Sequence, residues 1–122
     1  MVATRVLALE NDPGAALALR LTFERAGYEV VLSFDGQSGP RLAGEQRPDL
    51  VVVDCELLGA DPRPLLDRIR DRADVPMLLL TSPHLAENGY EGADGWLARP
   101  FTGEELLAEV EALLHPAGSD RG

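Results

Sequence analysis

Cysteine, lysine and aromatic residues are scarce in this chain, and no apolar run is long enough to cross a membrane. The single cysteine, Cys55, excludes an intramolecular disulfide and a zinc site made of several cysteines, and we expect a small buried thiol inside a strand. The first residues lack the basic and then apolar order of a secretory signal. These absences predict a cytoplasmic protein that does not span a membrane.

Basic residues are also few. The chain has 11 of them, all arginine, against 21 acids, which gives a formal net charge of −10. A surface of that sign repels a phosphate backbone, so we expect no direct binding of nucleic acid by this chain. The 122 residues suffice for one domain and are too few for two ordinary ones. We assign residues 1–116 to that domain and residues 117–122 to a tail or linker stub.

Apolar runs recur along the chain at the spacing of short strands. The predicted strands are Arg5–Leu9 and residues 28–33, 50–55, 75–81 and 94–98. The runs at 50–55 and 75–81 have almost no polar alternation, as parallel strands buried on both faces require. These two segments are therefore expected at the centre of a parallel sheet.

Helical patterns fill the intervals between these strands. Residues 13–26 place Leu17, Leu21 and Glu24 at helical spacing, and Gly27 follows as a C-terminal stop. Glycines and a proline predict that the helix within residues 35–46 is short or distorted.

The later helices differ in length. One is expected to start with Asp61 as its N-cap and to bury a stripe of leucines and Ile69. Residues 82–92 leave room for a helix of only about two turns, because Pro83 and two glycines interrupt them. Thr102 and Glu105 predict a capping box for the last helix, which His115-Pro116 ends.

Five strands that alternate with five helices predict an α/β fold. We expect a five-stranded parallel sheet with helices on both faces and a shortened fourth helix. In such sheets ligands bind beyond the carboxyl ends of the strands. The polar side chains expected at that edge are Glu10, Asn11, Asp12, Asp54, Thr81 and Arg99.

These residue types suit phosphoryl chemistry at a metal site. Carboxylates from two strand ends are typical ligands of Mg²⁺, which keeps several waters. Beside such a cation, Asp54 is placed to act as a nucleophile toward a phosphoryl group. The hydroxyl of Thr81 and the guanidinium of Arg99 are suited to hold phosphoryl oxygens.

At these residues the chain resembles the CheY-like receiver domain of two-component response regulators, a flavodoxin-like fold, and the likeness extends from Arg5 to Leu114. The matching segments, in chain order, are Glu10-Asn11-Asp12-Pro13, Pro48-Asp49-Leu50 through Asp54, Gly92-Ala93-Asp94 and Arg99-Pro100-Phe101.

The resemblance implies a role for each matching residue. Asp54 is then the phosphoacceptor, with Thr81 and Arg99 as its catalytic partners, and Thr81 and Trp96 form a conformational switch. The implied Mg²⁺ ligands are Glu10, Asn11, Asp54 and the backbone carbonyl of Glu56. The resemblance also implies a cis peptide bond before Pro100.

The same resemblance implies the partners. These are a histidine kinase or phosphotransfer protein that donates the phosphoryl group, and an output domain or partner protein that responds to it. A dimer through the fourth helix, fifth strand and fifth helix is also implied. No other cofactor is expected, and no enzymatic activity beyond self-catalysed phosphoryl transfer and hydrolysis.

The sequence departs from the family pattern in three ways, which makes the receiver atypical. Asn11 stands where the family has its second acid, so the affinity for Mg²⁺ is expected to be weaker. Arg99 replaces the usual lysine with a larger, planar cation. The interval from Thr81 to Arg99 is shorter than usual by about one helical turn.

These departures leave a second function open. A degenerate receiver would act as a phosphorylation-independent protein-interaction module. A flavodoxin-like binder of a nucleotide or flavin is a third reading of the same strand layout. Acids follow the first strand where that reading needs a glycine-rich phosphate loop, so the sequence disfavours it.

Overall fold

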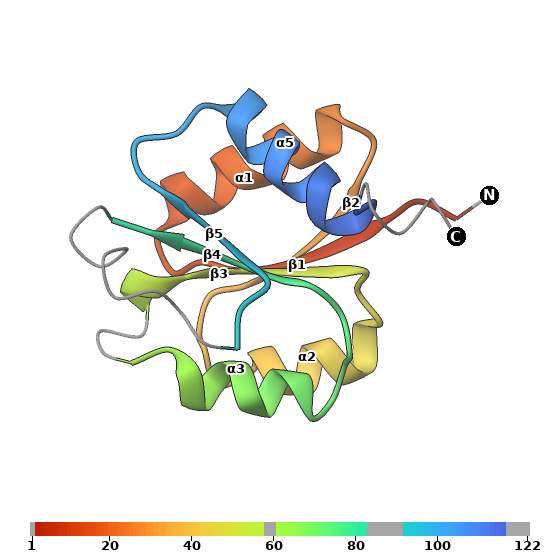
Figure 1. Ribbon diagram of the computed structural model, residues 1–122, viewed down its shortest axis with the longest axis vertical. Helices are drawn as coiled ribbons and strands as arrows, with labels where there is room; N and C mark the ends of the chain where they lie inside the picture. Colours follow the sequence, from red (N-terminus) through yellow and green to blue (C-terminus); the bar gives the residue numbers. More distant parts are fainter. Residues whose placement is uncertain (1, 58–60, 83–91, 117–122) are drawn as a thin grey trace.

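The computed structural model describes residues 2–57, 61–82 and 92–116, and their strands form one five-stranded sheet (Figure 1). The strand order is β2-β1-β3-β4-β5, and every neighbouring pair is parallel. The strands are β1 (Arg5–Leu9), β2 (Glu29–Ser33), β3 (Leu50–Asp54), β4 (Met77–Thr81) and β5 (Gly95–Ala98). The predicted parallel sheet is confirmed, although several strands are shorter than their apolar runs because those runs continue into the connecting loops.

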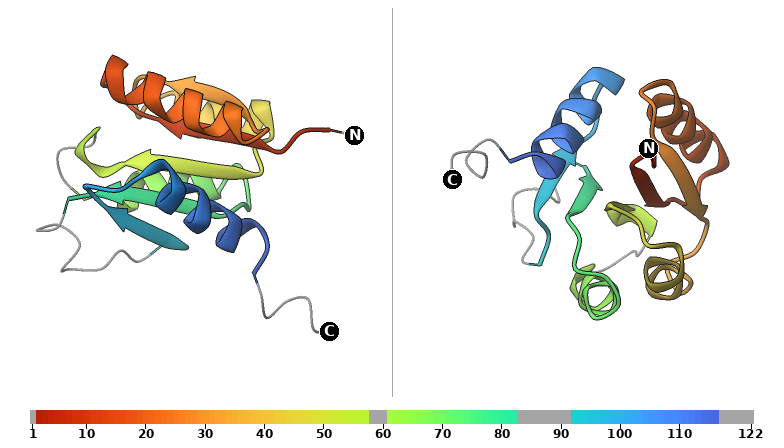
Figure 2. Two further views of the ribbon diagram at one scale, coloured as in Figure 1. Left: turned by 90° about the horizontal axis from the view of Figure 1, so that it is seen from above. Right: turned by 90° about the vertical axis from the view of Figure 1, so that its right-hand side faces the viewer.

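Helices cover both faces of the sheet, as Figures 1 and 2 show from three sides. The α-helices are α1 (Pro13–Arg25), α2 (Gly39–Gln46), α3 (Arg63–Arg70) and α5 (Gly103–Leu114), and a 3-10 helix, η1, spans Cys55–Leu57. α1 and α5 lie on one face and α2 and α3 on the other. The predicted fourth helix and tail fall almost wholly on residues 83–91 and 117–122, outside the described ranges.

Two helices that start at the carboxyl edge, α1 and α5, begin at side-chain caps. Asp12 caps α1, because its Oδ2 accepts a hydrogen bond from the backbone N–H of Ala15 at 2.8 Å. The predicted capping box of α5 is confirmed. Glu105 N–H donates to Thr102 Oγ1 at 3.1 Å, and Thr102 N–H donates to Glu105 Oε1 at 2.9 Å. Both caps hold their helices at the edge where the candidate site lies.

Two local predictions, at Asp61 and Cys55, were wrong in detail, and the exposure of two α1 leucines was not predicted. α3 begins two residues after Asp61, with Pro62 at the N-cap position, although Asp61 Oδ1 still accepts a hydrogen bond from the N–H of Arg63. Cys55 opens η1 instead of ending a strand, although it is buried. Leu17 and Leu21 lie on the exposed side of α1, where 55% and 42% of their surface is accessible.

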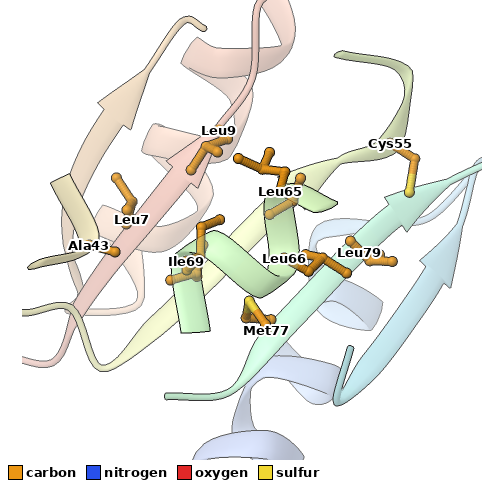
Figure 3. Close-up of a cluster of buried hydrophobic side chains, with 11 residues drawn as sticks. Leu7, Leu9, Ala43, Cys55, Leu65, Leu66, Ile69, Met77 and Leu79 are labelled. Atoms are coloured by element: carbon orange, nitrogen blue, oxygen red, sulfur yellow. The ribbon is translucent and has the colours of Figure 1, made fainter. Parts of the chain in front are cut away.

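The core consists of two apolar layers, one on each face of the sheet. Figure 3 shows the layer beneath α2 and α3, where Leu65, Leu66 and Ile69 of α3 meet side chains of β1 and β4. On the other face, Leu19 and Phe23 of α1 and the buried side of α5 cover the sheet. All five residues of β3 and of β4 are buried, as predicted for central strands. Within the described ranges, no helix combines the length and apolarity needed to cross a bilayer.

The N-terminus of α2 approaches the sheet closely enough to require a glycine. A Cβ atom on Gly39 would lie 2.6 Å from Cδ2 of Leu9, which is itself packed in the core. A Cβ on Gly44, in the same helix, would make only ordinary contacts of 3.6 Å or more, with Arg72. The two glycines of α2 therefore have different roles.

We expect Gly39→Ala to lower the free energy of unfolding by about 1–2 kcal/mol, because Leu9 must move within a filled core. The matched control Gly44→Ala should raise it by about 0.5–1 kcal/mol through better helix propensity. Urea unfolding of the two variants measures both changes. Equal effects of the two substitutions would contradict this packing.

Candidate functional site

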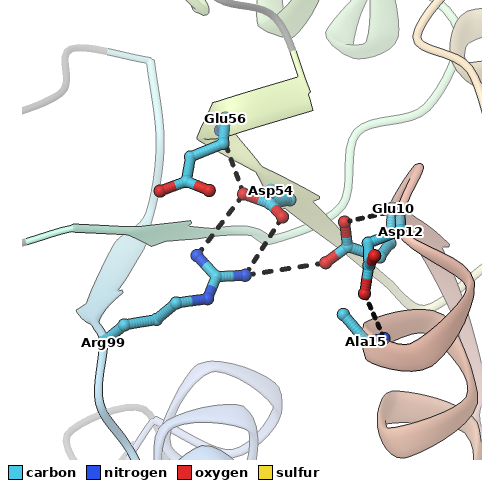
Figure 4. A network of polar contacts seen from close by, with 6 residues as sticks. All are labelled: Glu10, Asp12, Ala15, Asp54, Glu56 and Arg99. Atoms are coloured by element: carbon cyan, nitrogen blue, oxygen red, sulfur yellow. Dashed lines mark hydrogen bonds and ion pairs between the residues drawn. The ribbon is translucent and has the colours of Figure 1, made fainter.

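Three charged side chains meet at the carboxyl edge of the sheet. β1 and β3 are paired so that Leu9 lies beside Val53, which puts the next residues, Glu10 and Asp54, at the same level. Arg99 follows β5, and its backbone N–H donates to the carbonyl of Thr81 at 2.8 Å. The parallel register of the sheet thus delivers all three side chains to one place, as Figure 4 shows.

The guanidinium of Arg99 bridges the two carboxylates. Its Nη2 lies 3.0 Å from Asp54 Oδ2 and 3.5 Å from Glu10 Oε1, and its Nη1 lies 3.4 Å from Asp54 Oδ1 (Figure 4). Only 1% of Glu10 and 4% of Asp54 is accessible to solvent. Because two buried anions side by side repel strongly, the planar arginine cation is what makes this edge electrostatically tolerable.

Asp54 has further support from the loop that follows it. The backbone N–H of Glu56 donates to Asp54 Oδ1 at 3.0 Å. Oδ1 thus accepts hydrogen bonds from the Glu56 N–H and from Nη1 of Arg99, and Oδ2 accepts one from Nη2 of Arg99. The side chain of Glu56 is exposed. The arrangement orients the Asp54 carboxylate toward the edge of the sheet and engages both of its oxygens.

Glu10 is less well satisfied. Its Oε2 accepts from the N–H of Asp12 at 3.3 Å, whereas its Oε1 is buried and accepts no hydrogen bond from any residue that the structure describes. Burial raises the pKa of Glu10 from 4.5 to about 7, with the hydrogen bond and charge of Asp54 adding to the rise. The N–H of Asp12 and the charge of Arg99 oppose this rise.

The remaining predicted residues are placed differently. Thr81 is fully buried, and its Oγ1 donates to the carbonyl of Ser82 at 3.3 Å. Trp96 pairs across the strands with Leu79, two residues before Thr81, and is 46% exposed. Asn11 is exposed at the start of the loop before α1. The structure therefore gathers Glu10, Asp54 and Arg99, joins Thr81 to Arg99 through the backbone, and leaves Asn11 and Trp96 at the surface.

Two carboxylates are available to a metal ion here. Among the residues described, no three His, Cys, Asp or Glu side chains gather closely enough to form a larger cluster. Mg²⁺ commonly takes one or two carboxylates and completes its shell with water. A buried oxygen without a hydrogen-bond donor, Glu10 Oε1, is the kind of ligand such a cation prefers. The donor set fits Mg²⁺ held by Glu10 and Asp54.

A cavity of about 190 Å³ opens beside this site, between α1 and the start of α5. Its lining combines the charged side chains of Glu10 and Arg99 with mostly apolar residues of α1 and α5. The ring of Phe101 lies 5.9 Å from the guanidinium carbon of Arg99, at cation–π distance. Phe101 belongs to the Arg99-Pro100-Phe101 segment, and its contact with Arg99 was not predicted from the sequence. The Arg99–Pro100 bond is cis, as predicted.

The raised pKa of Glu10 sets a pH dependence of stability in metal-free buffer. The folded state binds the Glu10 proton more tightly than the unfolded chain, so the stability that this proton confers is present below pH 4.5 and lost as the pH rises to about 7. The expected loss is on the order of 2–3 kcal/mol.

Glu10→Gln should remove this loss, since glutamine has no proton to release. Unfolding free energies between pH 4.5 and 8 measure the slope. As a control, Glu104→Gln removes an exposed acid of α5 and keeps the wild-type pH profile. A Glu10→Gln variant with the full wild-type slope would contradict the assignment of the slope to Glu10.

Comparison with known proteins shows sequence relatives among transcriptional regulators. The family model described as response regulator receiver domain matches residues 6–111. The DNA-binding dual master transcriptional regulator RpaA of Synechocystis is 37% identical over 90% of this chain and 48% of its own length. The transcriptional regulatory protein CseB of Streptomyces coelicolor is 36% identical over 97% of this chain and 54% of its own length. The chain spans about half the length of these relatives.

Solved structures agree with the sequence relatives. The chemotaxis protein CheY4 of Vibrio cholerae superposes with a TM-score of 0.81 at 28% identity, over 93% of this chain and 100% of that one. The receiver domain of sensor histidine kinase PA1611 from Pseudomonas aeruginosa, with a magnesium ion in its active site cleft, gives 0.81 at 27% identity, over 93% and 98% of the two chains. The chain belongs to the response regulator receiver domain family of two-component signalling, whose members are phosphorylated on an aspartate with Mg²⁺.

Proposed function

We propose that Asp54 is the residue of this receiver that accepts the phosphoryl group, from a histidine kinase or a phosphotransfer protein. The observation that carries the proposal is the position of Asp54, whose carboxylate lies at the carboxyl edge of the sheet between Glu10 and Arg99. The edge thus combines a nucleophile, an acid for a metal ion and a cation for phosphoryl oxygens.

The proposed reaction forms an acyl phosphate. A carboxylate oxygen of Asp54 attacks the phosphorus of a phosphohistidine, and the P–N bond breaks with its electron pair passing to the imidazole nitrogen. Glu10 and Asp54, with the Glu56 carbonyl and the Asn11 amide as further candidates, are the proposed Mg²⁺ ligands. When bound, Mg²⁺ offsets the negative charge of the carboxylate and the phosphoryl oxygens as they approach.

Arg99 and Thr81 are proposed to hold the transferred group. Arg99 already supplies two N–H donors to the Asp54 oxygens, and Thr81 ends the neighbouring strand. The oxygens of a phosphoryl group on Asp54 would accept hydrogen bonds from the guanidinium of Arg99 and the hydroxyl of Thr81. A shift of Thr81 toward that group, with Trp96 on the same face of the sheet, is the proposed switch between two conformations.

The partners proposed for the switch follow from the relatives. Because the chain spans about half of regulators described as transcriptional, an output domain or partner protein is proposed to read its state. We propose residues 1–116 as the folded unit, in the cytoplasm, with dimer contacts through the fourth helix, β5 and α5. Any catalysis is proposed to be limited to phosphoryl transfer to Asp54 and hydrolysis of the acyl phosphate.

One observation favours the second function, a degenerate receiver that binds partners without phosphorylation. Arg99 engages both oxygens of Asp54, so neither is presented to a donor in this arrangement. A guanidinium that never leaves would keep the site inactive. Whether the intact chain is phosphorylated by acetyl phosphate separates the two functions.

Incubation with acetyl phosphate and Mg²⁺ should add one phosphoryl mass to the intact chain. Asp54→Asn should abolish this gain, because an amide oxygen is a far poorer nucleophile than a carboxylate. Asp67→Asn, which changes an exposed acid of α3, serves as the matched control and keeps the gain. Intact-protein mass spectrometry reads all three proteins. A folded wild-type chain that gains no mass would favour the degenerate receiver.

The proposed switch predicts an optical signal, because Trp96 is the only tryptophan and is partly exposed. Beryllofluoride with Mg²⁺, which stands in for the phosphoryl group, should shift the emission of Trp96. Thr81→Ala should reduce this emission shift by more than half, since the variant lacks the hydroxyl that is proposed to move toward the group on Asp54. A wild-type emission spectrum that stays constant, or a full response in Thr81→Ala, would exclude this switch.

A further inference from the structure

The oxygens proposed to bind Mg²⁺ are the oxygens that Arg99 contacts. Nη2 of Arg99 lies 3.0 Å from Asp54 Oδ2 and 3.5 Å from Glu10 Oε1. It thus spans the two carboxylates, the position in which a divalent ion would balance both charges (Figure 4). Two cations cannot occupy the gap between the same pair of carboxylates, since they repel each other and compete for the same lone pairs.

The chemistry of arginine makes this contact hard to displace. A guanidinium keeps its charge at any ordinary pH, and its planar fork matches both oxygens of one carboxylate. Nη1 and Nη2 engage Asp54 in this way, at 3.4 and 3.0 Å. A lysine ammonium is a single point donor and cannot make the same two parallel contacts.

The structure also provides a place for the displaced guanidinium. The cavity between α1 and α5 is lined by Arg99 and Glu10 and also by Thr22 and Leu106. Phe101 lines it too, and its ring already lies 5.9 Å from the guanidinium carbon. With about 190 Å³ of free volume, the cavity accommodates the end of an arginine side chain that keeps its aromatic neighbour.

We propose that Arg99 is a built-in competitor of Mg²⁺, which occupies the Glu10–Asp54 pair in the metal-free protein and is displaced toward the Phe101 cavity when the metal binds. The inference rests on the proposed function, because it concerns the same site. It adds a form of regulation: the guanidinium covers both oxygens of Asp54 until a divalent cation displaces it, after which it is available to bind the oxygens of an incoming phosphoryl group. The receiver then needs a higher concentration of Mg²⁺ to become reactive than it would without this contact.

The test is a Mg²⁺ titration of the full chain at constant ionic strength, followed by isothermal calorimetry and by the midpoint of thermal unfolding. Arg99→Gln should bind Mg²⁺ about tenfold more tightly than wild type, because the competing cation is gone. Arg99→Lys should fall between the two, because its ammonium retains the charge and loses the bidentate contact. The matched control Arg41→Gln removes an exposed arginine of α2, paired with Glu45, and should keep the wild-type affinity.

Two results would overturn the proposal. Equal affinities of wild type and Arg99→Gln would show that Arg99 does not compete. An Arg99→Lys affinity equal to wild type, beside a tighter Arg99→Gln, would show repulsion through space without displacement. Should Arg99→Gln not fold, the comparison of Arg99→Lys with wild type decides alone, because a tighter lysine variant supports displacement and an unchanged one excludes it.

Failure of this inference is distinguishable from failure of the proposed function. If wild type binds Mg²⁺ and is phosphorylated on Asp54 while the Arg99 variants bind the metal equally well, only the competition is excluded. If wild type gains no phosphoryl mass and Asp54→Asn binds Mg²⁺ as well as wild type does, the metal lies elsewhere and both proposals are excluded.

Discussion

The constraint on which this site depends is the burial of two carboxylates side by side. Glu10 and Asp54 are almost inaccessible to water, and the register of β1 and β3 fixes them at the same level. Neither can move away without disturbing strands that are buried on both faces. When both are ionised, a cation must therefore accompany the pair, and in this structure it is the guanidinium of Arg99.

This constraint connects the fold to the chemistry. Glu10 and Asp54 repel each other when no cation is present, and the same two carboxylates suit Mg²⁺. The oxygen proposed to attack phosphorus belongs to Asp54. Arg99 stands where the family pattern has lysine, and its planar guanidinium pairs with both carboxylates at once. The replacement of lysine by arginine is thus not neutral, since it changes how strongly the residue at this position binds Asp54 in the metal-free site.

The sequence predicted the sheet and the edge because their signals are local. Apolar runs mark the central strands; Asp54 ends one strand, and Glu10 and Arg99 each follow a strand directly. Their bridging was not predictable, because it depends on side-chain rotamers and on three strands far apart in the chain. For the same reason helical spacing alone did not show that Leu17 and Leu21 face solvent, or that Phe101 lies beside Arg99. The pairing of Asp61 with the side chain of Arg63 likewise depends on side-chain contacts.

The most direct test of this account is a pair of crystal structures of the chain, grown with Mg²⁺ and with a chelator. The account predicts that, without metal, Arg99 pairs with Asp54 and Glu10, and that with Mg²⁺ the ion contacts both carboxylates while the guanidinium has left Asp54 for the side of Phe101. A magnesium ion bound at this edge with the Arg99–Asp54 contact intact, or a metal bound without Glu10 and Asp54, would contradict it.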